Sequence, residues 1–371
     1  MVNTFSSLLY RYIVRPILFR FDSEAVHRLM VRLGVLLGDF SLTRKLMSSL
    51  FVSQYPQLIE SIADISFRSP VGLAAGFDYN AELMEVLPSL GFGFQTVGTI
   101  TNLSYAGNTT PRLGRLVKSR SLLVNKGFKN DGISAVLGRL SNKRFRFPVG
   151  LSIGITNTAN LKTLETGIAD IVSTFRKAEQ SNPPFSYYEL NISCPNLNTS
   201  ISFYAPEDFR ELLMAVTGLR LSKPLFIKMP IDRTEIEFDQ LIAVVLEFPV
   251  QGIIVGNLLH DRKDSAFVPA EINSAPRGNF SGIPTQKHSD HLIARAYKAS
   301  KGRLTIIGCG GVFSAEDAYR KIRLGASLIQ LITGLVFVGP QLVSEINRGL
   351  VRLLDRDTYN SISEAIGVDA R

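Results

Sequence analysis

The segment ELNISCPNLN (189–198) places a thiol among amides and a proline, at the point where an apolar run ends. Cys194 is one of only two cysteines in the chain, and the other is Cys309. One interpretation is a buried structural thiol. The other is a catalytic base, because the ordinary pKa of a thiol, about 8.5, puts the thiolate within reach near neutral pH.

A lysine ends a second apolar run, FIKMP (226–230). Burying an unpaired charge is costly, so an ordinary lysine here would extend its ammonium to solvent. The interpretation that we favour is functional: Lys228 places its positive charge beside an anionic cofactor or reaction intermediate.

The segment GCGGVFSAEDAYRKI (308–322) has the features of a phosphate site. Gly310 and Gly311 let backbone N–H groups approach an anion, and the helix predicted after them adds positive potential. The GKS or GKT of a P-loop is absent. Two further small-residue turns, ITG (332–334) and NFSGIP (279–284), contain Thr333, Ser281 and Gly282.

Eight short apolar runs from residue 68 onward must position these groups. They are 70–76, 94–99, 148–154, 187–192, 224–229, 251–257, 303–308 and 327–333. Buried parallel strands are near-continuous apolar runs, and helical patterns such as 206–221 and 314–325 separate several of these. Together they predict a (β/α)8 TIM barrel, with a doubly wound open sheet as the rival. Barrel active sites lie at the carboxyl ends of the strands, where amides, small residues, one lysine and one thiol occur here.

Residues 1–50 form a predicted helical extension, and residues 51–371 form the barrel. Aromatic and aliphatic residues of the extension are interrupted by arginines, and Pro16 should kink the first helix or start a new turn. Asp22 or Ser23 can cap a second helix. A helical period of apolar residues follows in Val26, Met30, Leu33 and Leu37. The extension is too polar to span a bilayer, so it either lies in a membrane interface or packs on the barrel as a helical hairpin.

Composition narrows the functional classes. No apolar run reaches the ~18 residues of a transmembrane helix, and a signal peptide fits poorly because arginines interrupt the apolar stretch. The net charge of +9 suits an anionic membrane or a phosphorylated ligand. We expect no nucleic-acid partner, since no zinc knuckle or long basic run is present. We expect no metal either, since four histidines occur without CxxC or HExxH.

The motifs together resemble those of dihydroorotate dehydrogenases, which are flavin barrels of pyrimidine biosynthesis. The resemblance covers nearly the whole chain. Its most specific parts are SPVGLAAGFD (69–78), VGTIT (97–101), GNTTPRLGRL (107–116), VNKGFKN (124–130), ELNISCPN (189–196), FIKMP (226–230), SGIP (281–284) and residues 308–340. The N-terminal helices, with HRL (27–29), look like the membrane-associated, quinone-using class 2 enzymes, in which the extension forms a mouth for the quinone.

The resemblance implies FMN-dependent oxidation of dihydroorotate to orotate in the de novo synthesis of UMP, with electrons passed to a quinone. Cys194 would abstract the C5 proton, the C6 hydride would go to N5 of FMN, and Lys228 would stabilise charge on the reduced flavin. The implied FMN positions are Ala75, Gly76, Thr99, Asn125, Asn157, Asn191, Lys228, Ser281, Gly282, Gly310, Gly311 and Thr333. The implied substrate contacts are Asn125, Phe128, Asn191, Asn196 and Asn257. His27 and Arg115 match the quinone path, and the protein would sit peripherally on a membrane, on the cytoplasmic face if it is bacterial.

Several positions depart from the family pattern. Class 2 enzymes usually have serine where this chain has Cys194, so the base looks like class 1 and the extension like class 2. Tyr79 follows AAGFD, where the family has a lysine that helps to hold the orotate carboxylate and the flavin. Lys126 and Lys129 are the candidates to replace that cation, but the sequence does not place them. Leu258 replaces a hydroxyl residue.

A further departure leaves either Thr156 or Asn157 as a flavin contact, since GITN (154–157) replaces the usual GKN. Because the departures cluster at the substrate, the alternative is another FMN-dependent barrel oxidoreductase that acts on a related cyclic amide. A non-enzymatic barrel that binds a phosphorylated ligand at a membrane is a third interpretation.

Overall fold

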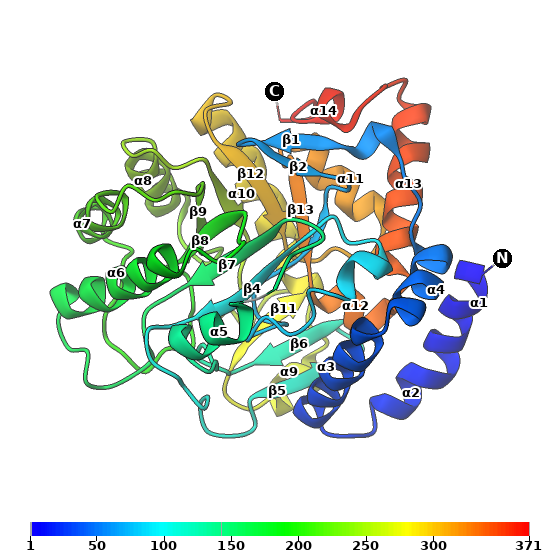
Figure 1. Ribbon diagram of the computed structural model, residues 1–371, viewed down its shortest axis with the longest axis horizontal. Helices are drawn as coiled ribbons and strands as arrows, with labels where there is room; N and C mark the ends of the chain where they lie inside the picture. Colours follow the sequence, from blue (N-terminus) through cyan, green and yellow to red (C-terminus); the bar gives the residue numbers. More distant parts are fainter. Residues whose placement is uncertain (1, 142, 371) are drawn as a thin grey trace.

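The computed structural model describes residues 2–141 and 143–370, and its core is a closed barrel of eight parallel strands (Figure 1). Each strand pairs with the next barrel strand along the chain, and the last pairs with the first. The strands are β3 (Val71–Leu73), β4 (Phe94–Ile100), β7 (Val149–Ile153), β8 (Tyr187–Asn191), β9 (Leu225–Met229), β10 (Gly252–Val255), β12 (Thr305–Cys309) and β13 (Leu328–Leu331). The predicted barrel is confirmed, with one strand in each of the eight apolar runs, and the doubly wound sheet is wrong.

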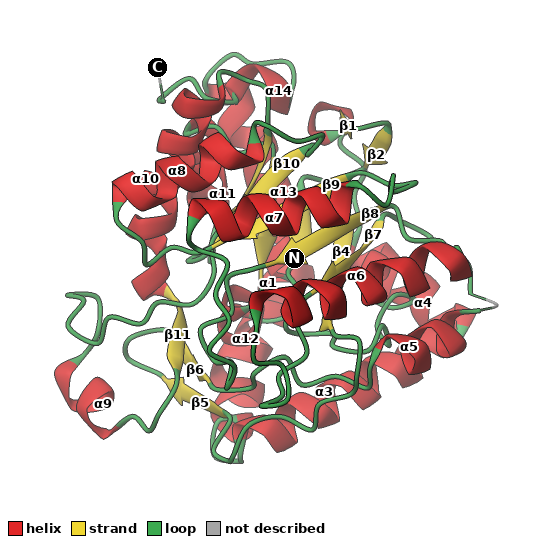
Figure 2. Cartoon of the chain, turned by 90° about the vertical axis from the view of Figure 1, so that its left-hand side faces the viewer, coloured by secondary structure: helices red, strands yellow, loops and turns green. Residues whose placement is uncertain are grey.

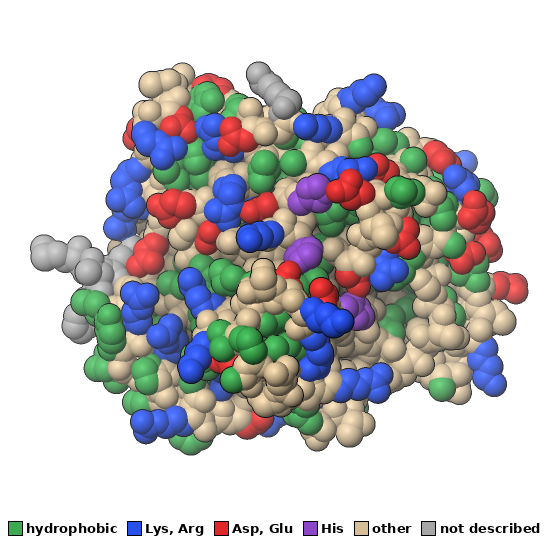
Figure 3. Space-filling view, turned by 180° about the vertical axis from the view of Figure 1, so that it is seen from behind, with side chains coloured by type: hydrophobic (Ala, Val, Ile, Leu, Met, Phe, Trp, Pro, Cys, Tyr) green, Lys and Arg blue, Asp and Glu red, His purple; other side chains and the backbone are tan. Residues whose placement is uncertain are grey.

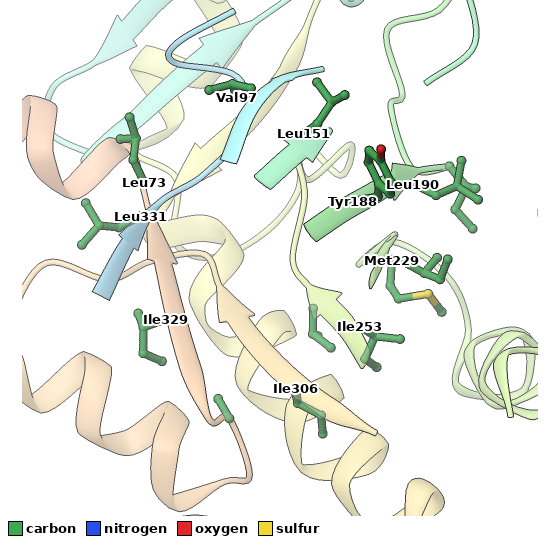
Figure 4. Close-up of a cluster of buried hydrophobic side chains, with 14 of the residues drawn as sticks. Leu73, Val97, Leu151, Tyr188, Leu190, Met229, Ile253, Ile306, Ile329 and Leu331 are labelled. Atoms are coloured by element: carbon green, nitrogen blue, oxygen red, sulfur yellow. The ribbon is translucent and has the colours of Figure 1, made fainter. Parts of the chain in front are cut away.

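Helices cover the outside of the barrel because alternate strand residues turn apolar side chains outward. Figure 4 shows these side chains from successive strands, among them Val97, Leu151 and Ile306. The covering helices are α5 (Ile133–Leu140), α6 (Leu164–Ser181), α7 (Pro206–Thr217), α8 (Glu235–Val245), α10 (Gln286–Ser300), α11 (Ala315–Arg323) and α13 (Leu342–Arg356). Three further short helices of the barrel region are α9 (Pro269–Ser274), α12 (Thr333–Val338) and α14 (Ile362–Ala365).

The two ends of the barrel are closed differently, as Figures 1 and 2 show. At the amino ends of the strands, a hairpin of β1 (Glu60–Ile62) and β2 (Ile65–Phe67) inserts Ile62 and Phe67 into a cluster of inward-facing apolar side chains. At the other end lies an antiparallel sheet in the order β11 (Asn279–Gly282), β6 (Ser121–Val124), β5 (Leu113–Leu116). The sequence patterns predicted neither of these sheets.

The N-terminal extension is helical and packs at the end of the barrel that carries the antiparallel sheet (Figure 1). It consists of α1 (Val2–Leu9), a π-helical turn (Tyr10–Val14), α2 (Arg15–Leu18), α3 (Ser23–Asp39) and α4 (Ser41–Phe51). Pro16 lies in the first turn of α2, directly after the π-helical turn, as expected for a proline that starts a new turn. Asp22 caps α3 by accepting a hydrogen bond of 2.8 Å from Ala25 N.

We predict that Phe67→Ala destabilises the barrel by about 3–5 kcal/mol, because it removes a buried ring that meets Phe94 edge to face at 5.3 Å. The measurement is the urea unfolding midpoint. Ser66→Ala, at the exposed neighbouring position, is the control and should change stability by less than about 0.5 kcal/mol. Equal midpoints for the two variants would show that the hairpin does not close the barrel core.

Candidate active site

Asn191 and Lys228 lie side by side at the carboxyl ends of neighbouring strands. They are direct partners in the parallel register of β8 and β9. Tyr187 and Phe226 face the interior of the barrel, and side chains two residues apart on a strand share a face. Asn191 and Lys228 therefore also point inward, at the end of the barrel where active sites are built.

A cavity of about 700 Å³ opens above these strand ends and continues between the helices of the extension. This size and its mostly apolar wall suit a small-molecule or cofactor site. Predicted site residues in its wall are His27, Ala75, Gly76, Thr99, Arg115, Phe128, Asn191, Cys194, Asn196, Lys228, Asn257 and Ser281. The wall also includes the predicted helical stripe of Val26, Met30, Leu33 and Leu37. The structure thus joins the strand-end residues and the extension in one space.

A chain of hydrogen bonds orients Asn191. Its amide donates to Thr99 Oγ1 at 2.8 Å, the Thr99 and Ser152 hydroxyls are 2.9 Å apart, and Ser152 donates to Glu189 at 2.7 Å. The carboxylate of Glu189, the preceding inward-facing residue of β8, accepts the last hydrogen bond of this series. It therefore sets the direction of each donation. The amide of Asn191 is therefore held in one orientation at the cavity wall.

The loop residues beyond β8 are held by other amides. Asn257 donates to the Ser193 carbonyl at 2.8 Å and to its hydroxyl at 2.6 Å. Asn279, on β11, donates to the Asn196 side chain at 2.6 Å. Ser193 and Asn196, on either side of Cys194, are thus anchored to the loop after β10 and to β11, and the thiol lies at the cavity wall.

Asn108 is a central residue that the sequence analysis missed. Its amide donates to Asn125 Oδ1 at 2.9 Å and to the Asn196 carbonyl at 2.8 Å, and its own Oδ1 accepts from Asn157. The only available signal was its place in the motif 107–116. Asn108 connects three separate loops around the same end of the cavity.

Asn125, Asn157 and Thr156 do not lie in the cavity wall of the described chain. Asn157 is 2% exposed and uses its side chain on Asn108, the Gly127 carbonyl and Asn198 N. Thr156 donates to Asp170 from both its N–H and its hydroxyl. In the ligand-free structure both side chains are therefore engaged within the protein, and Asn157 holds the loop at Gly127.

The environment of Cys194 disfavours its thiolate in the ligand-free protein. Burial raises the pKa of the Cys194 thiol to about 12, although a backbone hydrogen bond at Asn196 and the charge of Lys228 lower it. Cys194 is therefore a neutral thiol in the ligand-free protein at pH 7. Burial also raises the pKa of Cys309, which lies inside the barrel at the end of β12.

Lys228 is 4% exposed, and no hydrogen bond or ion pair within the described residues engages its ammonium. The alternative of a lysine that extends its ammonium to solvent is thus not what the structure shows. A buried charge without a partner is unfavourable, so the arrangement favours a bound anion beside it.

The predicted phosphate turn assembles from three segments. Gly310 and Gly311 have φ of +115° and +67°, and none of the hydrogen bonds described for the chain uses their backbone N–H groups. The Ser281 and Thr333 hydroxyls are 2.7 Å apart. A Cβ on Gly282 would lie 2.9 Å from Thr333 Cγ2, so glycine permits the close approach. Free N–H donors and hydroxyls at glycine turns are a donor set that fits a phosphate.

The extension contributes His27 to the cavity wall. Its Nε2–H donates to the Phe77 carbonyl at 2.9 Å, because a carbonyl only accepts. Burial, with the Lys126 ammonium nearby, lowers the pKa of His27 to about 3, so its ring is neutral. Arg115, on β5, donates to the Phe21 carbonyl at 2.9 Å and stacks on the Phe19 ring. Both predicted quinone-path residues therefore lie where the extension meets the barrel.

The fold and the site define an enzyme of the (β/α)8 barrel class, with polar groups from several strand ends around one ligand cavity. The family model for dihydroorotate dehydrogenase matches residues 57–354. The chain belongs to the dihydroorotate dehydrogenase family, which confirms the resemblance seen in the sequence.

Relatives named dihydroorotate dehydrogenase (quinone) match almost end to end. The protein of Trichodesmium erythraeum is 33% identical, and the match covers 97% of this chain and 98% of the relative. That of Rhizobium etli is 36% identical over 96% and 95%. The crystal structure of DHODH from Eimeria tenella in complex with ferulenol has a TM-score of 0.82 at 27% identity, covering 94% of this chain and 96% of that chain. These similarities support the quinone-using class, extension included.

We predict that alkylation of Cys194 by iodoacetamide in the ligand-free protein accelerates about tenfold per pH unit from pH 7 to 10. The reason is that the thiolate is the nucleophile and its pKa is raised to about 12 by burial. Peptide mass spectrometry in a Cys309→Ala background measures the rate at Cys194 alone. A rate that levels off below pH 9 would contradict the buried, neutral thiol.

Proposed function

We propose that the chain oxidises dihydroorotate to orotate with bound FMN and passes the electrons to a quinone. The observation that carries the proposal is the single cavity that runs from Cys194 and Lys228 to His27 and Arg115. A substrate at the strand ends and an acceptor between the helices would both reach a cofactor in the middle. Family membership and the names of the relatives support the same reaction.

The residues present fit FMN. The N–H groups of Gly310 and Gly311 and the hydroxyls of Ser281 and Thr333 would hold its phosphate. Lys228 would hold a positive charge beside its ring system. When bound, FMN supplies the two-electron acceptor of the oxidation.

The asparagines bind and orient the substrate in this proposal. The dihydroorotate ring presents amide donors and carbonyl acceptors, and an asparagine side chain offers both in return. Asn191, Asn196 and Asn257 lie in the cavity wall and are held by hydrogen bonds to neighbouring loops. Asn125 is held one layer behind, through Asn108.

Cys194 removes the proton from C5 of the substrate. Its thiol must first lose its own proton, and the raised pKa makes this step unfavourable at pH 7. Lys228 is the neighbouring charge that lowers the pKa of Cys194. The rate of proton abstraction should consequently rise with pH over the whole neutral range.

The acceptor reaches the cofactor through the apolar part of the cavity. Its wall there consists of α3 side chains and residues of the first helices, and the neutral His27 and the Arg115 guanidinium supply polar groups at its inner end. An apolar passage with two polar groups suits the ring and tail of a quinone.

The outer face of the extension is the proposed membrane-binding surface. Its exposed apolar residues are Leu8, Tyr12, Ile13, Ile17, Phe21, Leu29, Leu36, Phe40, Leu42, Leu46 and Leu50. Basic side chains accompany them, and Figure 3 shows hydrophobic and basic groups together at the left and lower left of the view, with few acidic groups. No described helix is long and apolar enough to cross a bilayer. We infer peripheral binding, with the apolar face in the interface.

We predict that anaerobic dihydroorotate bleaches the yellow holoprotein and that a ubiquinone or menaquinone analogue restores the colour. In Cys194→Ala the flavin should stay bound while its reduction slows by roughly 10²–10⁴-fold, the usual contribution of a positioned base. Absorbance in a stopped-flow mixer measures both rates, and Cys309→Ala is the matched control.

Retained flavin with no bleaching by dihydroorotate would instead favour an FMN barrel oxidoreductase for a related cyclic amide, as Tyr79 and Leu258 suggest. A near-normal reduction rate in Cys194→Ala would remove Cys194 from its role as base. A colourless protein with no affinity for FMN would contradict the proposal as a whole.

We predict that Leu42→Glu with Leu46→Glu reduces binding to anionic vesicles at least tenfold, because each change puts a charge into the apolar interface. These leucines are 76% and 60% exposed on α4. The control is Met214→Glu with Ile236→Glu, at side chains 61% and 71% exposed on the barrel. Vesicle co-sedimentation measures binding, and equal losses in both pairs would contradict a specific role of the extension.

A further inference from the structure

A second buried cation lies in the cavity wall besides Lys228. Lys126 is 7% exposed and lines the cavity, and none of the hydrogen bonds or ion pairs found in the described chain involves its ammonium. The neighbouring Lys129 is different, because it forms an ion pair with Glu24 at 2.9 Å. Of the two lysines in VNKGFKN, Lys126 is therefore the one available to a ligand.

The ring of Tyr79 holds Lys126 in place. The Lys126 Nζ stands 4.3 Å from the ring centroid of Tyr79, and such a cation–π contact is stronger when it is desolvated. The Tyr79 ring in turn packs against His27, with ring centroids 5.1 Å apart. Tyr79 therefore fixes the position of the lysine through its ring without neutralising the positive charge.

The backbone around Lys126 belongs to the amide cluster at the substrate end. Asn108 donates to the Lys126 carbonyl through its N–H and to the Asn125 side chain through its amide. The next residue, Gly127, accepts from Asn157 through its carbonyl. These bonds hold Lys126 on the loop that also carries Asn125 and Phe128, next to the asparagines proposed to bind the ring.

We propose that Lys126, whose ammonium lies over the ring of Tyr79, binds the carboxylate of the substrate. The inference rests on the proposed function and deepens it. Tyr79 occupies the position where the family pattern has a lysine, and its phenol brings no charge. In this chain Lys126 supplies the positive charge, and the ring of Tyr79 supports the lysine. An incoming carboxylate gives the buried ammonium the partner that the protein lacks.

The arrangement makes recognition of the carboxylate depend on pH. Burial lowers the pKa of Lys126 to about 7, which Glu24 on α3 raises and Lys129 and Arg28 lower. The neutral His27 adds no charge. Above pH 7 the ligand-free lysine loses its proton, so the affinity for a carboxylate should fall toward tenfold per pH unit. A neutral ligand should show no such fall.

The test compares orotate with uracil, which has the same ring without the carboxylate. Dissociation constants are measured on the flavin-loaded, full-length protein by equilibrium dialysis, so that no turnover is needed. Lys126→Met should weaken orotate about 10- to 100-fold, as expected for a lost hydrogen bond to a charged group, and leave uracil unchanged. Arg28→Met removes a nearby, more exposed charge and should change orotate binding less than about threefold. Adding Tyr79→Lys to Lys126→Met restores the family pattern and should recover orotate affinity.

Each other outcome contradicts the proposal. If Lys126→Met weakens orotate and uracil equally, the lysine only supports the structure of the loop. If orotate affinity survives Lys126→Met, the carboxylate binds elsewhere and only this inference fails. If the wild-type holoprotein neither binds orotate nor is bleached by dihydroorotate, the proposed function fails together with the inference.

Discussion

Closure of eight parallel strands determines which side chains can reach the active site. Alternation along each strand sends every second residue inward, and the hairpin of β1 and β2 fills the amino end of that interior. Polar inward residues are therefore collected toward the carboxyl ends. Asn191 and Lys228 share a register position because β8 and β9 are neighbours, and the Ser152–Glu189 pair sits below them.

Desolvation connects the strand ends to the extension. The helices α1–α4 cover the end of the barrel, and the resulting burial perturbs the pKa values of Cys194, His27 and Lys126 in the directions that favour their neutral forms. The same burial strengthens the attraction between each remaining positive charge and an anion. The extension thus acts on the chemistry of the site through the dielectric environment as well as through the passage that it builds.

The fold and much of the site could be predicted from the sequence because they depend on local patterns. Buried strands are continuous apolar runs, and strand ends carry the polar residues that follow them. The raised pKa of Cys194 could not be predicted, because burial depends on segments far away in the chain. The choice between Lys126 and Lys129 could not be made, since Gly127 and Phe128 both have positive φ and turn the loop between them. Asn108 and Asn279 were missed because a single asparagine in a loop carries no periodic signal.

Glu24 limits how segments of different family members can be exchanged. This buried α3 carboxylate binds Arg112 at 3.0 Å and Lys129 at 2.9 Å, so one residue of the extension holds both loops that surround the substrate end. The two regions are consequently not interchangeable modules. A chimera that gave this barrel the N-terminal helices of a relative would leave Arg112 and Lys129 without their partner, unless the new helices carried a carboxylate at the same place. Extension and substrate loops should therefore be inherited together.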